Sequence, residues 1–343
     1  SFDASAEPPP PDAPPLDRVA DRPAACQPGR ALVTQLRVAH MAPQVGPIDL
    51  CMQKRGTTPT TSMARFQTPS WPSDGLDYGE VSQSVPLNQR VVLTNEAWDV
   101  AVVARGTPCD RVPADVAPLA TRSIQLDPST LRLVVITAEP ALDGHLVPFI
   151  NLLPDELCTD CMYPAVDVRA VHASIGAASQ RLTFTMLPQG APPPTSVAAM
   201  QTFATGVSYG GDQGYACNQL WGSLVAGRVN APVQFEVSTA AGRLVARSET
   251  LSLKVSILTQ LRTATVFFEG EYNEDGVPGP YEPGFVVCYD GLATGTLSNC
   301  ERVAAQSAAP DAGVDPPAGD ASNDDAPVID VLPAVDDLDG HAP

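Results

Sequence analysis

The apolar residues of this chain gather in short runs that are rich in valine, isoleucine and leucine. The runs are separated by proline, glycine, asparagine and aspartate, which favour turns. Amphipathic helices, which would show a period of about 3.6 residues, are absent from the pattern. The pattern therefore predicts an all-β chain. In the first part of the sequence, strands are expected near residues 32–38, 48–52, 81–85, 91–93, 98–103, 124–126 and 131–137.

A second series of apolar runs follows in a similar order, with strands expected near residues 166–172, 181–187, 233–238, 244–247, 251–258, 263–269 and 285–289. The two series share several short motifs, in one order and at nearly one spacing, which indicates two copies of one domain. The matches are Arg37-Val38-Ala39-His40 with Arg169-Ala170-Val171-His172, Tyr78-Gly79 with Tyr209-Gly210, Leu131-Arg132 with Leu261-Arg262, and Glu139 with Glu269.

Many short strands divided by turn residues are typical of a sandwich. The predicted fold is two tandem immunoglobulin-like antiparallel β-sandwich domains, with a Pro-rich N-terminal spacer and an acidic C-terminal tail. The predicted parts are a spacer at 1–28, a first domain at 29–140, a packed connector at 141–166, a second domain at 167–305 and the tail at 306–343.

The tail contains nine aspartates and neither lysine nor arginine, a composition typical of disorder. One strand-like stretch interrupts it, Val328-Ile329-Asp330-Val331-Leu332. This stretch could add to an exposed sheet edge in its own chain or in a neighbouring one. Val328, Ile329, Val331 and Leu332 are therefore candidate assembly residues.

The net charge of −19 argues against nucleic acid as a partner, because phosphate binding needs a basic surface. It also argues against docking on anionic membranes. No apolar stretch is long enough to predict a transmembrane helix. The chain starts at Ser1 without an initiator methionine, which suggests a processed product. An extracellular or outer-surface location is expected, and a lipidated residue upstream of Ser1 is one way in which the chain could be anchored.

Eight cysteines in an acidic, Pro-rich chain suggest an oxidising compartment and disulfides. We expect Cys51 to pair with Cys109, and Cys288 with Cys300 across a short excursion. Cys158 and Cys161 have the spacing of a redox motif or half a zinc site, but they lie in a connector and not at the start of a helix, so a disulfide role is favoured. Cys26 and Cys217 could pair with each other or with those two.

His40 and His172 are the histidines that both copies keep. One histidine per copy, without a second ligand at suitable spacing, does not make a metal site. Each is expected to tie a strand end to the following turn, and Asp49, which the second copy lacks, is expected to be structural too.

The acidic loop with Glu271, Glu274, Asp275 and Glu282 could hold calcium, but it lacks the usual order of ligands, so a solvated hairpin is favoured. No catalytic residue, metal or cofactor is predicted.

The segment from Leu36 to Leu50 resembles the opening motif of the domain-of-unknown-function 4397 family, with Arg37, Val38, His40, Pro43 and Asp49 at matching positions. Two further segments, 76–81 and 98–102, look like the Tyr-Gly segment and the strand that follow in that family, and 168–174 with 207–210 repeat part of the pattern. The resemblance implies a β-sandwich in a secreted or cell-surface bacterial protein, and it implies no activity.

These observations favour a non-enzymatic secreted or cell-surface protein whose tandem sandwiches form a binding or adhesion module for a protein or a glycan. Binding is expected in loops 55–75 and 189–200, which precede the Tyr-Gly segment in each copy. The alternative is a structural subunit of an extracellular filament or surface layer, assembled from copies of itself by strand addition through the tails.

Overall fold

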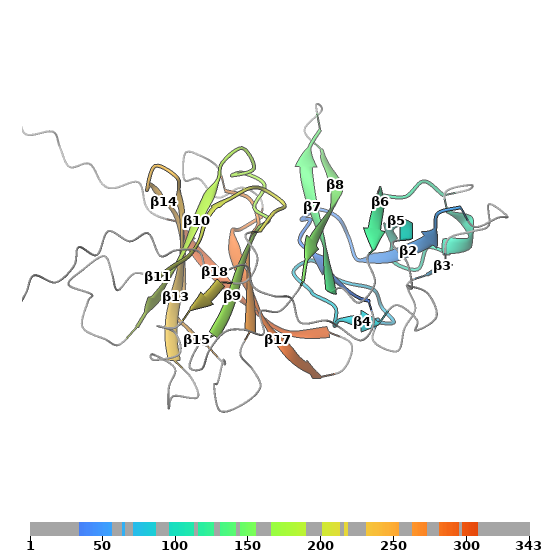
Figure 1. Cartoon of the computed structure of the whole chain (residues 1–343). Coiled ribbons are helices and arrows are strands. Elements are labelled where there is room, and N and C mark those ends of the chain that lie inside the picture. The colour runs from blue at the N-terminus through green and yellow to red at the C-terminus, as the bar shows by residue number, and fades with distance from the viewer. Residues whose placement is uncertain are drawn as a thin grey trace, which may run out of the picture. The chain divides into compact units, whose positions relative to one another are not determined.

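The computed structural model describes residues 34–56, 64–65, 71–86, 96–112, 116–126, 131–141, 145–155, 166–189, 201–212, 216–218, 231–253, 263–272, 281–294 and 297–307. All of them belong to one compact unit that ends at Ala308. They are mostly strands (Figure 1), which confirms the all-β prediction. The helical element in this part of the chain is a short 3-10 helix, η1 (Cys109–Arg111). No helix in the described ranges is long and apolar enough to cross a membrane.

The first half, residues 34–155, forms two four-stranded sheets, one in the order β4-β1-β7-β8 and the other in the order β3-β2-β5-β6. Their strands are β1 (Gln35–His40), β2 (Ile48–Lys54), β3 (Ala64–Arg65), β4 (Val85–Pro86), β5 (Glu96–Ala104), β6 (Ala120–Leu126), β7 (Leu131–Pro140) and β8 (Leu146–Pro154).

The second half, residues 166–307, forms one continuous sheet in the order β11-β10-β13-β14-β18-β17-β16-β9-β12, with β15 paired to β13. Its strands are β9 (Val166–His172), β10 (Leu182–Pro188), β11 (Gln201–Val207), β12 (Ala216–Asn218), β13 (Ala231–Thr239), β14 (Leu244–Ser248), β15 (Leu251–Leu253), β16 (Thr263–Glu269), β17 (Gly284–Thr294) and β18 (Leu297–Ser307).

The strand order of the first half returns in the second. Strands β4-β1-β7-β8 correspond to β12-β9-β16-β17, and β3-β2-β5-β6 correspond to β11-β10-β13-β14. In each half the first strand pairs in parallel with a strand near the end of the same copy, since Gln35 lies opposite Leu131 and Asp167 lies opposite Thr263. The sequence predicted antiparallel sheets, and every other pair of named strands in the described ranges is antiparallel. The parallel exception arises because strands from opposite ends of one copy need no hairpin between them.

The pairing also corrects the spacing of the repeat. Gln35 and Asp167 are equivalent positions of the two copies, and their partners in the parallel pairs are Leu131 and Thr263. Leu131 therefore corresponds to Thr263, two positions further along the chain than Leu261, which the sequence match had suggested. In the same way the pairing aligns Thr137, and not Glu139, with Glu269. A shift of two positions keeps every side chain on the same face of the strand. The pattern of apolar residues therefore could not reveal it.

Alternating side chains of these strands fill one core in each half. In the first half, Leu36 and Val38 of β1 and Val134 and Ile136 of β7 pack with residues of β2 and β5, such as Val102. In the second half, the equivalent positions of β9 and β16 pack on a core rich in phenylalanine. The phenylalanines of that core are Phe184, Phe203, Phe235, Phe268 and Phe285.

A third core joins the two halves. The remaining side chains of β1 and β7, among them Ala39 and Val135, pack with Val171, Phe267 and Val286 from β9, β16 and β17. These strands are therefore covered on both faces, and this explains why their sequences are almost continuously apolar. The two halves meet face to face through the sheets that contain the parallel pairs.

Several strands lie where the sequence predicted no strand, among them β3, which falls within the expected loop 55–75, and β11 and β12. β8 falls within the expected connector and pairs with β7 along nine positions, from Arg132↔Pro154 to Pro140↔Leu146. β18 was not predicted, and the expected excursion between Cys288 and Cys300 is a β-hairpin of β17 and β18, in which these two cysteines lie directly opposite each other.

Two disulfides join described residues, and they are the two pairings that the sequence led us to expect. Cys51 bonds to Cys109 across a sequence separation of 58, and Cys288 bonds to Cys300 across a separation of 12. Cys51 and Cys109 pack with Val103 and Val112 in a small core on the outer face of β2 and β5.

Several sequence predictions fall outside the described residues: the spacer at 1–28, Cys26, Cys158 and Cys161, loop 189–200 except Gln189, and the tail with Val328, Ile329, Val331 and Leu332. Of loop 55–75, the ranges 55–56, 64–65 and 71–75 are described, and Cys217 is described as part of the backbone of β12.

Candidate ligand pocket between the two halves

The two repeated histidines hold turns. The Nε2 atom of His40 lies 3.2 Å from the carbonyl oxygens of Val45 and Gly46, and its Nδ1 accepts a hydrogen bond from the Ala42 amide at 3.4 Å. His172 repeats this arrangement, with Nε2 3.0 Å from the Ala177 carbonyl oxygen and Nδ1 accepting from the Ser174 amide at 3.4 Å. A ring that donates from one nitrogen and accepts at the other is neutral.

Burial favours the same neutral form, because it disfavours the charged imidazolium. Burial lowers the pKa of His40 and of His172 to about 4, although hydrogen bonds to backbone carbonyls partly oppose the shift. Both side chains are completely buried. The histidines are therefore parts of the scaffold, in line with the interpretation from sequence.

The repeated Tyr-Gly segment docks on these histidines. The amide of Gly79 donates to the His40 carbonyl at 2.8 Å, and the amide of Gly210 donates to the His172 carbonyl at 2.7 Å. Both glycines have positive φ, 82° and 66°, which other residues rarely adopt. The tyrosine before each glycine is thereby held beside the junction of the two halves.

Asp49 is structural as well. Its buried carboxylate accepts hydrogen bonds from Trp71 Nε1 at 3.3 Å and from the Gly106 amide at 2.8 Å. It ties the end of loop 55–75 to the turn after β5. The hydrogen bonds described above direct the His40 ring to backbone groups, so the pair does not act as a catalytic dyad.

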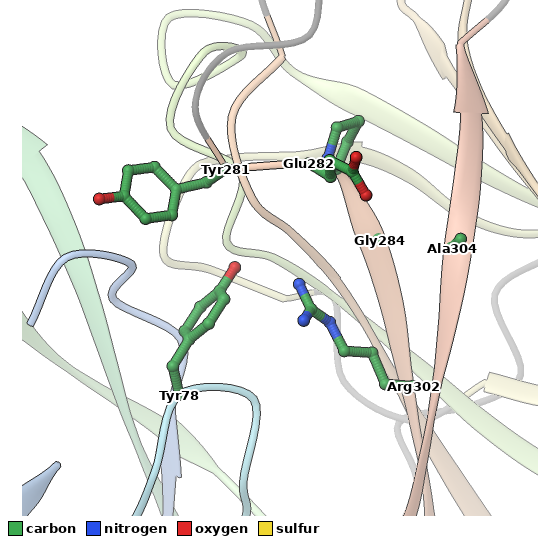
Figure 2. A pocket seen from close by; sticks show the side chains of 7 residues that line it. Tyr78, Tyr281, Glu282, Gly284, Arg302 and Ala304 are labelled. Atoms are coloured by element: carbon green, nitrogen blue, oxygen red, sulfur yellow. The ribbon is translucent and has the colours of Figure 1, made fainter. Parts of the chain in front are cut away.

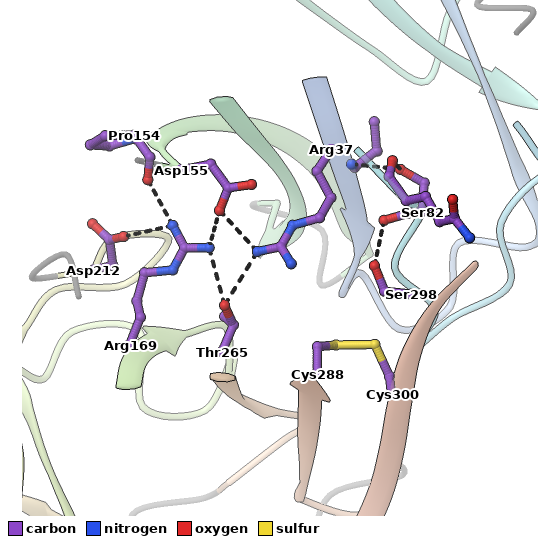
Figure 3. A network of polar contacts seen from close by, with 12 residues as sticks. Arg37, Ser82, Pro154, Asp155, Arg169, Asp212, Thr265, Cys288, Ser298 and Cys300 are labelled. Carbon is purple, nitrogen blue, oxygen red and sulfur yellow. Dashed lines mark hydrogen bonds and ion pairs between the residues drawn. A yellow bond between two sulfur atoms is a disulfide. The ribbon is translucent and has the colours of Figure 1, made fainter. Parts of the chain in front are cut away.

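The repeated arginines meet at the junction (Figure 3). Arg37 donates to Asp155 Oδ1 at 2.9 Å, and Arg169 donates to the same oxygen at 2.6 Å. Each of them also lies 3.2 Å from the Thr265 hydroxyl. Arg169 additionally donates to the Pro154 carbonyl and lies 3.4 Å from Asp212 Oδ2. Two arginines thus face two carboxylates in a buried network, and charge balance makes such burial tolerable.

A second polar contact at the junction involves the first tyrosine of the repeat. The Arg302 guanidinium carbon lies 5.2 Å from the centre of the Tyr78 ring, and Arg302 Nε lies 2.7 Å from Glu269 Oε1. Glu269 is completely buried, whereas the Arg302 side chain is 51% exposed. Tyr78 comes from the first half, and the other two residues come from β16 and β18.

Burial dominates the electrostatics of this contact. It raises the pKa of the Glu269 carboxyl, and the Arg302 guanidinium opposes that rise. Burial also raises the pKa of the Tyr78 hydroxyl, and the nearby charge of Glu269 adds to the effect. Since the buried Glu269 carboxylate needs a cation, the half-exposed Arg302 side chain is held in place at the junction.

A pocket of 460 Å³ opens above this contact. Tyr78, Tyr281, Glu282, Pro283, Gly284, Arg302 and Ala304 line it. Figure 2 shows the Tyr78 hydroxyl and the Arg302 guanidinium pointing toward Tyr281 and Glu282. Aromatic rings beside a few fixed polar groups, in a cavity of about 300–1,000 Å³, are the usual make-up of a small-ligand site.

The equivalent tyrosine of the second half has a different environment. The Tyr209 hydroxyl donates to the Ala138 carbonyl, and the Ala138 amide lies 3.2 Å from the same hydroxyl. A Cβ at Gly210 would lie 2.5 Å from Asn151 Nδ2, so this side of the junction is tightly filled, whereas a Cβ at Gly79 would have no neighbour nearer than 3.8 Å. The pocket is therefore a feature in which the two copies differ.

Sequence reasoning identified two members of the site as scaffold positions, Tyr78 and Glu269. It missed Arg302 and Tyr281, and it expected Glu282 in a solvated acidic loop but not in this pocket, because the proximity of these residues to Tyr78 depends on long-range packing. A local signal did exist, since Arg302 lies two residues after Cys300, which already marked a disulfide-bonded strand.

Within the described residues, no three histidine, cysteine, aspartate or glutamate side chains gather in a way that could hold a metal ion. Glu274 and Asp275 of the expected acidic loop fall outside these residues. No family model matches the chain, and no curated protein matches it.

Proposed function

We propose that the protein is a non-enzymatic binding module, located outside the cell or on its outer surface, that recognises a protein or glycan ligand in the pocket of Tyr78, Tyr281 and Arg302. The proposal rests on the make-up of the pocket: both halves contribute residues to it, and the buried Glu269 carboxylate holds the pocket residue Arg302 in place. Fixed polar groups reduce the ordering that binding would otherwise require.

The surroundings of the pocket support this role. Tyr78 lies three residues after the end of loop 55–75, where the sequence led us to expect binding. Tyr281 and Glu282 are accessible, and Tyr and Arg are the residue types that contribute most to binding surfaces. The disulfides support an oxidising location, and the resemblance of 36–50 to a secreted family points in the same direction.

The test is an array of glycans and cell-surface proteins probed with the full chain. We expect specific binding that Tyr281→Ala weakens about tenfold or more, the usual loss at a central aromatic contact. Arg181→Ala, a change of an exposed residue of the second half, is the matched control and should leave binding unchanged. Binding that is unaffected by Tyr281→Ala would exclude this pocket, and an array without any bound ligand would count against the binding role.

A further inference from the structure

The side chains that line the pocket are polar, aromatic or small. Among the described residues, the lining includes no large aliphatic side chain. A stable protein–protein interface has an apolar core and involves about 20–30 residues on each side. Leu119, Val147 and Phe149, which are the exposed large hydrophobic residues of the described ranges, do not belong to the lining. The pocket therefore suits a small polar group better than a protein surface.

The charges in and beneath the pocket compensate each other. The exposed Glu282 carboxylate and the half-exposed Arg302 guanidinium line the pocket, and the buried Glu269 carboxylate pairs with Arg302 at 2.7 Å. An anionic ligand would meet an arginine that is already paired, in a chain whose net charge of −19 repels anions. A cationic ligand would compete with Arg302 for Glu269 and for the face of the Tyr78 ring, which lies 5.2 Å from the guanidinium carbon. Both arguments favour an uncharged ligand.

The polar groups that face the pocket are complementary to hydroxyl groups. A guanidinium only donates hydrogen bonds, an ionised carboxylate only accepts them, and a phenol hydroxyl does both. In Figure 2 the Glu282 carboxylate, the Arg302 guanidinium and the Tyr78 hydroxyl border the same space. Two hydroxyl groups on neighbouring carbon atoms satisfy such a set, because one can donate to Glu282 while the other accepts from Arg302.

The two tyrosines add apolar surface to these polar groups. Tyr78 comes from the first half and Tyr281 from the second, and both rings border the pocket (Figure 2). A tyrosine ring combines a large apolar surface with a polar hydroxyl. A sugar ring has C–H groups on its faces and hydroxyls at its edge, so it can contact the aromatic rings and the charged groups at the same time. Gly284 lies beside Arg302 without a side chain, which keeps this part of the lining open to a ring.

We infer that the pocket binds an uncharged sugar residue of a glycan through two neighbouring hydroxyl groups. The inference rests on the proposed binding function and specifies the class of its ligand. Tyr78 and Tyr281 contact the C–H groups of the sugar. Glu282 accepts a hydrogen bond from one hydroxyl, and Arg302 donates one to the other. Glu269 is a positioning residue, because it pairs with Arg302 and acts on the ligand through it.

An array probed with the full chain tests the ligand class. It carries neutral oligosaccharides, their counterparts with uronic acid or sulfate groups, and peptides of mixed charge. We expect binding to neutral oligosaccharides, and we expect Tyr281→Ala to weaken it. The affinity should change by less than about twofold between low and high salt, because salt screens interactions between charges and the ligand has none.

Deoxy derivatives of the bound sugar test the contact itself. For the methyl glycoside that binds best, replacement of one contacting hydroxyl by hydrogen should weaken binding about tenfold or more, the usual loss for a hydrogen bond to a charged group. Glu282→Ala should cause a similar loss with the parent methyl glycoside, but no further loss with the derivative that lacks the hydroxyl bound by Glu282. Isothermal titration measures these affinities.

The matched control is Glu139→Ala, which removes an exposed glutamate of β7 and should leave all affinities unchanged. Glu282 is exposed, so Glu282→Ala should keep the thermal unfolding profile of the unsubstituted protein. An unchanged profile would show that any lost affinity is local to the pocket.

The outcomes separate this inference from the proposed function. If the ligands that depend on Tyr281 all carry carboxylate or sulfate groups, or are peptides, the binding role stands and the inference of a neutral sugar is wrong. The inference is also wrong if Glu282→Ala and every single deoxygenation leave the affinity for the neutral sugar unchanged. If nothing binds, or if Tyr281→Ala has no effect on binding, the proposed function fails and this inference fails with it.

Discussion

Arg37 and Arg169 donate to the same oxygen of Asp155, although they come from different halves of the chain. They are equivalent positions of the repeat, so the duplication has brought two copies of one arginine together around one carboxylate. Thr265, which also contacts both guanidiniums, is equivalent to Leu133 of the first half. One polar substitution between the copies therefore completes the network.

Asp155→Asn should destabilise the protein by about 3–5 kcal/mol, because the buried network then keeps two guanidiniums but only one carboxylate, Asp212. The matched control is Asp77→Asn, which alters an exposed ion pair with Arg105 and should cost less than about 1 kcal/mol. Urea unfolding at neutral pH measures both. Equal losses of stability in the two variants would show that the buried network stabilises the protein no more than an exposed ion pair does.

Acid should weaken the fold through the two buried histidines, His40 and His172. Their pKa falls from 6.5 in the open chain to about 4 in the fold, so the unfolded state binds more protons between these values. The stabilising contribution is complete above pH 6.5 and is lost as the pH falls toward 4, by roughly 3 kcal/mol for each histidine.

Unfolding experiments at pH 7 and pH 5 check this dependence. His172→Gln preserves a donor near the position of Nε2 but does not titrate, so the variant should lose less stability between the two pH values than the unsubstituted protein. His145→Gln is the control at an exposed histidine and should retain the full pH dependence. If His172→Gln retained the full pH dependence of stability, groups other than His172 would be responsible for that dependence.

The two disulfides should differ in their contribution to stability. Closure of the loop between Cys51 and Cys109, with a separation of 58, corresponds to about 4 kcal/mol, if the unfolded chain loses entropy as a simple loop does. Closure of the loop between Cys288 and Cys300, with a separation of 12, corresponds to about 3 kcal/mol on the same assumption. Guanidinium unfolding of the two double Cys→Ala variants measures the difference. A larger loss for the hairpin disulfide would contradict the loop-entropy account.

Gly79 and Gly210 allow a comparison of equivalent positions. Alanine at either must adopt a positive φ, which costs about 1–2 kcal/mol. Gly210→Ala should cost a further 1–3 kcal/mol, roughly the usual cost of overpacking, because its Cβ would lie 2.5 Å from Asn151 Nδ2. Thermal unfolding of the two variants shows which substitution costs more stability. A larger loss for Gly79→Ala would contradict the packing difference between the two sides.

Local patterns predicted much of the fold, including most strands, the repeat and the turn role of His40. The alternation of apolar residues could not reveal β18, whose sequence Leu297–Ser307 is largely polar and is stabilised by two neighbouring strands. It could not reveal the pocket either, since Tyr78 and Arg302 belong to different halves and meet only when both halves pack. Side-chain contacts over such separations depend on the relative placement of sheets, which sequence patterns do not contain.

The core that joins the halves has a consequence for how the chain reaches this state. Ala39 and Val135 lie on a sheet that can form early, but Phe267 and Val286, which cover it, come much later in the sequence. Contacts over such separations slow folding. During synthesis, an apolar sheet face therefore stays open until β16 and β17 arrive, and in that interval the chain depends on its low local concentration, its negative charge or a chaperone to avoid aggregation.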